Sequence, residues 1–266
     1  MDRDREFGDR LAVIIPTYGR DDLTAAVLDD LRPHDGPLAI YLVDNRGDYP
    51  EPYCGEVLLR PGSNLGWAGG CNWGLLAAQG KFDAYVLLNN DVRLSPHFLL
   101  NMVEGWRTRG ASLLGPVYDH NWPHQRSSYE GDAASYEART RDHRVPFVDG
   151  TCMFIPEATL NRVGLLDAES WPRHGWGCDK DYALRVRQIG GSVWVTERCY
   201  LNHLGRQTAV TFGGYSERAA EDENDSGMAA KWGSQWVDRL FEGFEGLTRV
   251  GRTQSALRES LRHSPD

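Results

Sequence analysis

Short apolar runs recur through the first part of the chain. Residues 11–15 and 38–43 are continuous apolar stretches rich in β-branched side chains, which is typical of strands buried on both faces. Shorter runs at 57–59 and 84–88 predict two further strands. Such runs, without polar alternation, favour the interior of a parallel sheet over an exposed antiparallel one.

Stretches with helical spacing separate these predicted strands. We expect Asp21 or Asp22 to cap the first helix, and Ser95-Pro96 to begin another that carries an apolar stripe from Phe98 onward. A third helix is expected over 71–79, with Gly80 as its terminating residue. Strands and helices that alternate over the first ~115 residues predict a doubly wound α/β sheet.

The second half of the chain is less regular. Its expected segments are, in order, a long polar loop over 121–144, one or two strands within 145–155, a helix over 179–189, a strand from Ser192 that leads to His203, and a tail that turns amphipathic over 229–244. We therefore predict one domain over residues 1–206 and a helical C-terminal appendage over 207–266.

Charge and composition narrow the classes of function. The formal net charge is −9, which disfavours general binding to nucleic acid or to anionic lipid. The charged N-terminus lacks the apolar segment of a signal peptide, and no apolar run is long enough to span a membrane. Five scattered cysteines without a Cys-x-x-Cys pair suggest reduced thiols. We expect a cytoplasmic protein without an integral membrane segment.

Polar side chains follow directly after the predicted strands, at Thr17, Asp44 and 89–91. Carboxyl ends of parallel strands meet at one edge of a sheet, so we expect these side chains to face one site. Asp91 there suits a hard divalent cation that bridges two phosphates, and the two asparagines before it can hydrogen-bond a ligand without adding charge. The alternative is an Asx-turn that only closes the strand.

Two carboxylates, Asp179 and Asp181, stand two residues apart at a predicted helix start. The helix dipole keeps a carboxylate there ionised, and an ionised carboxylate can take a proton from an attacking hydroxyl. Residues two apart in a helix point about 200° apart, so both cannot face one substrate. Asp181 lies one turn before Arg185 and can pair with it, which leaves Asp179 as the candidate base or as a plain helix cap.

His203 and the glycine-rich turn over 64–70 are weaker signals. A histidine after a strand is often structural, but beside a metal on Asp91 its imidazole becomes a plausible ligand. The turn has neither the dinucleotide spacing nor a Gly-Lys-Ser/Thr end, so it is either a tight turn or a close backbone approach to a nucleotide. Trp67 and Trp176 can line a sugar site or simply pack.

Seven segments, in this order, resemble the large family 2 of inverting glycosyltransferases, and most of all its rhamnosyltransferase-like branch. They are residues 13–20, 42–45, 64–72, 87–91, 149–153, 177–182 with Arg185, and finally His203. The resemblance covers about residues 11 to 206. It implies the GT-A fold, a single Rossmann-like, doubly wound mixed sheet, here followed by the helical C-terminal appendage.

The resemblance also implies roles for individual residues. Asp179 would be the catalytic base, and Asp91 with His203 would hold Mn²⁺ or Mg²⁺. The donor would contact Pro16, Thr17, Tyr18, Arg20, Asp44, Asn45, Asn64, Gly66, Trp67, Gly70, Asn72, Asn89, Asn90 and Arg206. The acceptor or the transferred sugar would contact Gly150, Thr151, Trp176 and Asp181.

The sequence departs from the family pattern at two positions. Cys178 stands where the family often has a glutamate before the base, so any help from that glutamate is lost. Asn89 stands where the family has the first acid of Asp-x-Asp, which leaves fewer charged ligands for a metal. Asparagines occur there in the branch that the chain resembles.

The implied reaction is a metal-assisted single displacement that moves a sugar from a UDP or dTDP donor onto an acceptor hydroxyl. The acceptor is a glycan, a lipid-linked glycan, a small molecule or a macromolecule. The sequence is compatible with a homodimer. A nucleotidyltransferase is disfavoured because the loop over 16–20 is short and poor in glycine. A catalytically inactive sugar- or nucleotide-binding module is disfavoured because Asp91, Asp179 and His203 occur together. A glycoside hydrolase would need a paired acid and base across the glycosidic bond.

Overall fold

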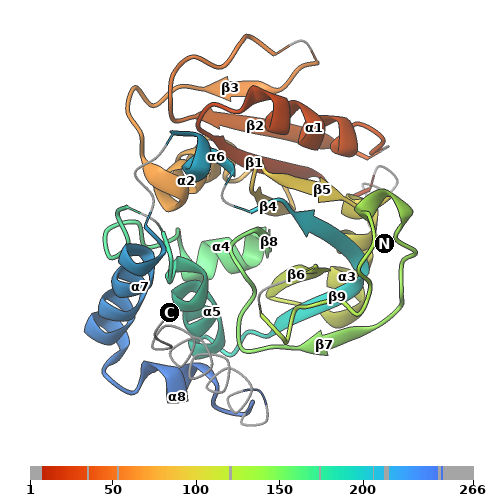
Figure 1. Cartoon of the computed structure of the whole chain (residues 1–266). Coiled ribbons are helices and arrows are strands. Elements are labelled where there is room, and N and C mark those ends of the chain that lie inside the picture. Colours follow the sequence, from red (N-terminus) through yellow and green to blue (C-terminus); the bar gives the residue numbers. More distant parts are fainter. Residues whose placement is uncertain are drawn as a thin grey trace, which may run out of the picture.

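The computed structural model describes residues 8–34, 36–52, 54–119, 122–173, 175–205, 207–212, 216–244 and 247. Its strands are β1 Leu11–Thr17, β2 Leu38–Asp44, β3 Val57–Leu59, β4 Ala84–Leu88, β5 Val92–Leu94, β6 Leu113–Tyr118, β7 Asp142–Arg144, β8 Cys152–Pro156 and β9 Val193–His203. They form a nine-stranded sheet in the order β3-β2-β1-β4-β8-β6-β9-β5, with β7 paired to β9 (Figure 1).

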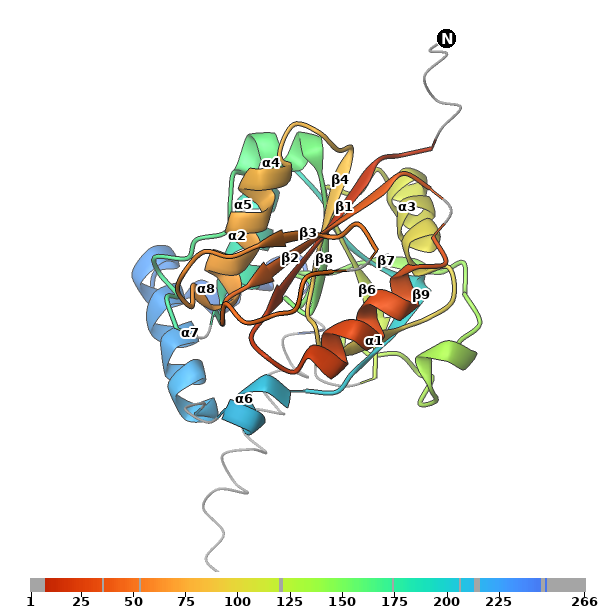
Figure 2. The same cartoon turned by 90° about the horizontal axis from the view of Figure 1, so that it is seen from above.

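Helices cover both faces of this sheet. They are α1 Asp21–Leu31, α2 Gly66–Ala78, α3 Phe98–Arg109, α4 Glu157–Val163, α5 Cys178–Gln188, α6 Gln207–Phe212, α7 Glu217–Trp232 and α8 Trp236–Leu240, with a 3-10 turn at Ala133–Ser135. Figure 2 shows α1 and α3 on one side of the sheet and α2, α4 and α5 on the other. The predicted doubly wound arrangement is therefore confirmed.

The parallel half of the sheet follows from its buried apolar strands. β1 pairs in parallel with β2 on one side and with β4 on the other, and Thr17 lies in register with Asp44. Every residue of β1 and β4 is buried, as continuous apolar runs predict. The sheet then becomes mixed, because β8 runs antiparallel to both β4 and β6.

Three helix boundaries differ from the prediction. α2 begins at Gly66 rather than at residue 71, so the glycine-rich turn is the first part of the helix itself. Arg20, at φ 53°, precedes α1 without a side-chain cap, while Asp21 lies in the first helical turn beside the positive end of the dipole. α3 begins at Phe98, because the Ser95 hydroxyl accepts the Tyr200 amide at 3.0 Å and so serves the sheet.

The long loop expected over 121–144 is interrupted by β7. This edge strand is polar, and its Asp142 carboxylate accepts the Thr196 hydroxyl at 2.6 Å and the Arg109 Nε at 3.0 Å. Its backbone pairs with β9, and its side chains are polar, so the sequence shows no apolar alternation there. Within residues 145–155, only the part from Cys152 onward is a strand.

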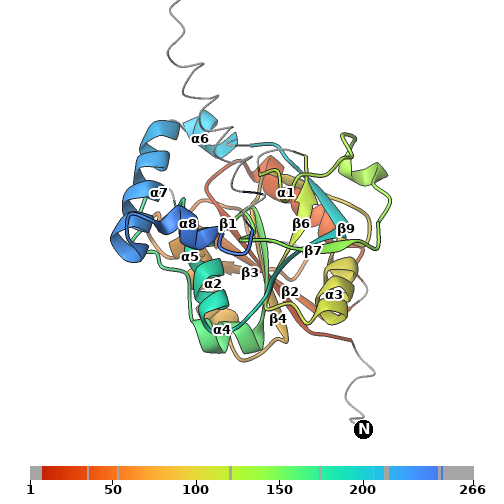
Figure 3. The same cartoon turned by 90° about the horizontal axis from the view of Figure 1, so that it is seen from below.

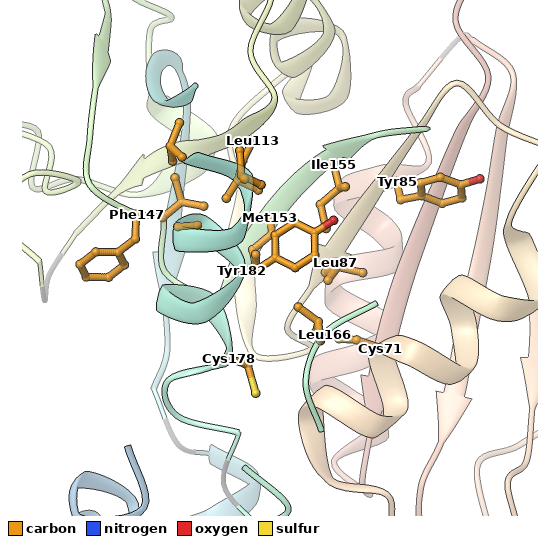
Figure 4. Close-up of a cluster of buried hydrophobic side chains, with 14 of the residues drawn as sticks. Cys71, Tyr85, Leu87, Leu113, Phe147, Met153, Ile155, Leu166, Cys178 and Tyr182 are labelled. Carbon is orange, nitrogen blue, oxygen red and sulfur yellow. The ribbon is translucent and has the colours of Figure 1, made fainter. Parts of the chain in front are cut away.

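The core between α5 and the sheet holds the start of α5 in place. Figure 4 shows the Tyr182 ring of α5 facing Met153 and Leu87 of the sheet. All three side chains have 0% exposure and belong to one buried cluster, which also includes Cys71 and Cys178. The five cysteines are free thiols, as their spacing predicts.

The last two helices, α7 and α8, pack beside α5 (Figures 1 and 3). Met228 and Trp232 of α7 join the same buried cluster as Tyr182. The Trp171 indole lies against two glycines, Gly177 before α5 and Gly227 within α7, and a Cβ at either would stand 2.5 Å from its Nε1. This close approach lets α7 pack beside the start of α5. Among the described residues, no helix is long and apolar enough to span a membrane.

Gly227→Ala tests this packing. In an ordinary helix interior, alanine is favoured over glycine by about 1 kcal/mol. Here the added methyl group would meet the Trp171 ring, so we expect the free energy of unfolding, measured by urea denaturation, to fall by roughly 1–3 kcal/mol. Ser226→Ala, at the exposed neighbouring position of α7, is the control and should change it by less than about 0.5 kcal/mol. A Gly227→Ala protein as stable as the wild type would contradict the close approach.

Candidate functional site

The carboxyl ends of β1 and β4 are joined by buried polar side chains. The Thr17 hydroxyl lies 3.0 Å from the Thr24 hydroxyl, and the Asn90 amide donates to both oxygens at 3.3 Å and 3.1 Å. All three residues are buried. The predicted neighbours Thr17 and Asn90 therefore do meet, and their hydrogen bonds fix the first loop against the end of β4.

Asp44 and Asn45 organise the loops after β2. The Asp44 carboxylate accepts three backbone amides, from Arg46 at 3.1 Å, Gly47 at 2.8 Å and Tyr49 at 2.8 Å. Asn45 accepts the Leu65 amide and donates to the Gly66 carbonyl, each at 3.2 Å. These side chains hold the glycine-rich start of α2 beside the end of β2.

The start of α2 comes close to the first strand and to the end of β4. A Cβ at Gly70 would stand 3.0 Å from the Asn45 amide nitrogen and 3.1 Å from Pro16. Trp67 donates its Nε1 proton to the Asn89 side chain at 2.8 Å, and its ring contacts Gly150. Trp67 therefore connects α2 with two other parts of the predicted site.

The loop after β1 is partly covered by α6. The Tyr18 and Phe212 rings meet edge to face, with centroids 5.5 Å apart. Arg20 pairs with Asp22 at 2.8 Å and donates to Gln207 at 3.4 Å. Tyr18 and Arg20 thus lie beside the segment that follows β9. Arg206, expected at the diphosphate, lies outside the described residues.

Asp91 and His203 are brought together by strand pairing. β5 and β9 run antiparallel with Val92 opposite His203, which puts Asp91 beside the histidine. The His203 Nε2 lies 3.4 Å from the Asp91 Oδ1, and both side chains are largely buried. Burial opposes the charged forms, but the contact between the two outweighs it, which lowers the pKa of Asp91 and raises the pKa of His203.

The Asp91–His203 pair offers an oxygen and a nitrogen ligand on adjoining strands. Within the described part of the chain, no group of three His, Cys, Asp or Glu side chains is arranged to hold a metal. Two protein ligands are too few to enclose an ion. They suit a divalent cation whose other coordination positions are taken by water and substrate phosphates. The pair fits an ion of that kind.

Asp179 occupies the first turn of α5 and is only 7% exposed. Its carboxylate accepts the Lys180 amide at 2.8 Å and the Gly150 amide at 3.3 Å. Burial raises the pKa of Asp179, the Lys180 ammonium counteracts this, and the nearby charge of Asp149 adds to the rise. A carboxylate with a raised pKa is a stronger proton acceptor than an ordinary surface aspartate.

The turn at residues 149–151 lies between the Asp91–His203 pair and Asp179. Gly150 donates to Asp179, while the Thr151 hydroxyl lies 3.5 Å from the His203 Nδ1. Asp149 accepts the Thr151 amide at 2.9 Å and the Trp122 Nε1 proton at 3.1 Å. Sequence reasoning missed Asp149 and Trp122 as site residues, although the Asp-Gly-Thr segment before β8 was a signal for the former.

Asp181 has a different environment from Asp179. It is 0% exposed, and its oxygens lie 2.8 Å from the Arg185 Nε, 2.8 Å from the Lys231 Nζ and 2.9 Å from the Trp232 Nε1. The predicted pairing with Arg185 is confirmed. Both Asp181 oxygens are therefore bonded to α5 and α7, whereas contact with an acceptor was expected for this residue.

Three other residues were expected at the site, namely Asn72, Asn64 and Trp176. Asn72 accepts the Leu166 amide at 3.0 Å and donates to the Leu166 carbonyl at 2.8 Å, so its amide group fixes a loop. Asn64 is exposed and accepts the Gly66 amide at 2.9 Å. Trp176 is half-buried and directly precedes Gly177, the residue before α5.

Sequence comparison identifies related proteins. Residues 12–164 match the model of Glycosyl transferase family 2. Three uncharacterised mycobacterial proteins, one from Mycobacterium bovis and two from strains of Mycobacterium tuberculosis, are each 38% identical to this chain over 207 residues. The aligned part covers 77% of this chain and 78% of each relative.

Two solved structures share the fold. GalNAc-T7, crystallised with UDP, GalNAc and Mn²⁺, is similar at a TM-score of 0.64 and 14% identity over 89% of this chain and 50% of that one. Staphylococcus aureus TarS is similar at a TM-score of 0.52 and 12% identity over 88% of this chain and 44% of its own. The chain thus spans about half the length of these structures, and the likeness shows a GT-A fold.

Asp181→Asn tests the structural role of the buried carboxylate. The change leaves the cations of Arg185 and Lys231 without a buried negative partner, although Lys231 keeps Asp167 at 2.7 Å. We expect the free energy of unfolding to fall by roughly 3 kcal/mol, the lower end for breaking a buried pair. Asp222→Asn, an exposed carboxylate of α7 that lies 4.0 Å from Arg218, should change it by less than about 0.5 kcal/mol. Equal urea midpoints for the two variants would contradict this role.

Proposed function

The chain belongs to glycosyl transferase family 2, and we propose that it moves a hexosyl group from a UDP or dTDP donor onto an acceptor hydroxyl with inversion of configuration. Glycosyl transfer itself follows from the family. One observation carries the finer proposal: the turn at 149–151 contacts both the Asp91–His203 pair and the Asp179 carboxylate. The turn thus lies between the proposed metal ligands, Asp91 and His203, and the proposed base, Asp179.

The donor half of the proposed site lies at the ends of β1, β2 and β4. We propose that Asp91 and His203 hold Mn²⁺ or Mg²⁺, and the GalNAc-T7 structure, which contains UDP and Mn²⁺, supports this. When bound, such an ion neutralises negative charge on a leaving diphosphate. Tyr18 and Arg20 are the proposed contacts to the nucleotide, since the oxygens of Asp44 are already bonded to its own loop.

Asp179 performs the proposed proton transfer. The acceptor hydroxyl gives its proton to the Asp179 carboxylate while its oxygen forms a bond to the anomeric carbon of the sugar. The bond from that carbon to the diphosphate oxygen breaks, and the nucleoside diphosphate leaves with the electron pair. Attack from the face opposite the leaving group inverts the configuration. Gly150, Thr151 and Trp176 are the proposed contacts to the acceptor or the sugar.

Asp91→Ala tests the donor half of the site. The diphosphate loses its ion-mediated link to the protein, so we expect the affinity for UDP or dTDP in the presence of Mn²⁺ to fall at least about tenfold. Isothermal titration calorimetry with and without Mn²⁺ measures it. Asp222→Ala, on the exposed side of α7, is the matched control. Unchanged Mn²⁺-dependent affinity in Asp91→Ala would rule out this ligand.

Asp179→Asn tests the base. The amide cannot accept the proton, so turnover should fall by roughly 10²–10⁴-fold while donor affinity stays close to that of the wild type. The assay is release of nucleoside diphosphate with a panel of UDP- and dTDP-sugars, dTDP-rhamnose included. Asp181→Asn, compared at equal folded concentration, should keep most of its turnover. The assignment is wrong if Asp181→Asn is inactive and Asp179→Asn is not.

A further inference from the structure

Lys180, next to the proposed base, is an unusual residue for the first turn of a helix. Its side chain is 9% exposed, whereas lysines are seldom buried without a specific partner. The Nζ lies 3.6 Å from the Asp179 Oδ1 and sits over two rings, 5.2 Å from the centroid of Trp122 and 5.3 Å from that of Phe147. The ammonium is therefore held between aromatic faces and one carboxylate.

We propose that Lys180 is a positioning residue that keeps the Asp179 carboxylate ionised and aimed at the turn over 149–151; its catalytic importance rests on the proposed role of Asp179. The aromatic faces attract the ammonium through their quadrupoles without offering it a competing anion. Trp122 is itself fixed by its bond to Asp149 at 3.1 Å. The rings and the turn thus set the position of the cation, and the cation sets that of the carboxylate.

Among the described residues, Lys180 supplies the positive charge that lowers the pKa of Asp179. The other groups that face Asp179 are Asp149 from the turn, Tyr118 at the end of β6 and Cys178 on the same helix. Burial raises the pKa of Tyr118 and the pKa of the Cys178 thiol, so both are neutral near pH 7. Asp149 adds a negative charge, which disfavours a second one on Asp179.

His124, in the loop after β6, is another described titratable group that faces Lys180. Burial lowers the pKa of His124 to about 4, so the imidazole is neutral at physiological pH and supplies no cation. Without the Lys180 ammonium, the amides of Lys180 and Gly150 would still counteract burial and the charge of Asp149, but no positive charge among these neighbours would. The proton would then stay on Asp179 up to a higher pH, and a protonated carboxyl cannot act as a base.

Lys180→Met removes the charge and keeps the length of the side chain. We expect the acidic limb of the plot of kcat/KM against pH to move to higher pH. On that limb kcat/KM should fall at least about tenfold more than it does on the alkaline plateau. Lys180→Arg, which keeps a cation, should restore most of the wild-type profile. Lys231→Met, which removes another lysine beside a carboxylate of the same helix, is the matched control and should leave the limb in place.

A direct titration separates this proposal from the assignment of the base. Carbon-13 NMR of aspartate-labelled protein follows the Asp179 carboxyl, whose signal is identified by its loss in Asp179→Asn. The midpoint of its titration should lie at higher pH in Lys180→Met than in the wild type. If Lys180→Met does not fold, Lys180→Gln is used in its place. A shifted midpoint with an active Asp179→Asn enzyme would overturn the base but not the influence of Lys180. An unchanged midpoint would show that Lys180 only packs.

Discussion

The pairing of β4 with β8 is the constraint on which the site depends. It places Leu88 opposite Cys152, and the Asn89 amide extends the ladder to the Thr151 carbonyl at 3.0 Å. The turn before β8 is therefore locked beside the segment that ends in Asp91. The Gly150 amide of the same turn donates to the Asp179 carboxylate, so this turn connects Asp179 with the segment that ends in Asp91.

This antiparallel insertion also explains the mixed sheet. The parallel strands β1, β2 and β4 deliver their polar ends to one edge, as is usual in doubly wound proteins. β8 enters from the opposite direction, so its beginning, rather than its end, faces that edge. β5 and β9 then add Asp91 and His203 through a second antiparallel pair. Residues from distant parts of the chain thus converge without a long loop.

The sequence was most informative where burial dictates the pattern. The strands predicted over 11–15 and 84–88 are buried on both faces, so their position and their parallel direction could be predicted, although β1 continues to Thr17. The edge strand β7 could not be predicted, because its pairing with β9 and the bonds of Asp142 involve polar residues and leave no apolar pattern. Asp91 and Asp179 stood out from their local context, whereas the contacts of Trp122 and Lys180 depend on tertiary folding that spacing alone does not encode.

The indole of Trp171 couples the packing of two regions that lie far apart in the sequence. It fits against Gly177, which opens the helix of the proposed base, and against Gly227 of α7. A larger side chain at position 227 would have to displace the Trp171 ring, and with it the contact of that ring with Gly177. A displacement of α7 would therefore be transmitted through this one ring to the residue that precedes the helix of Asp179.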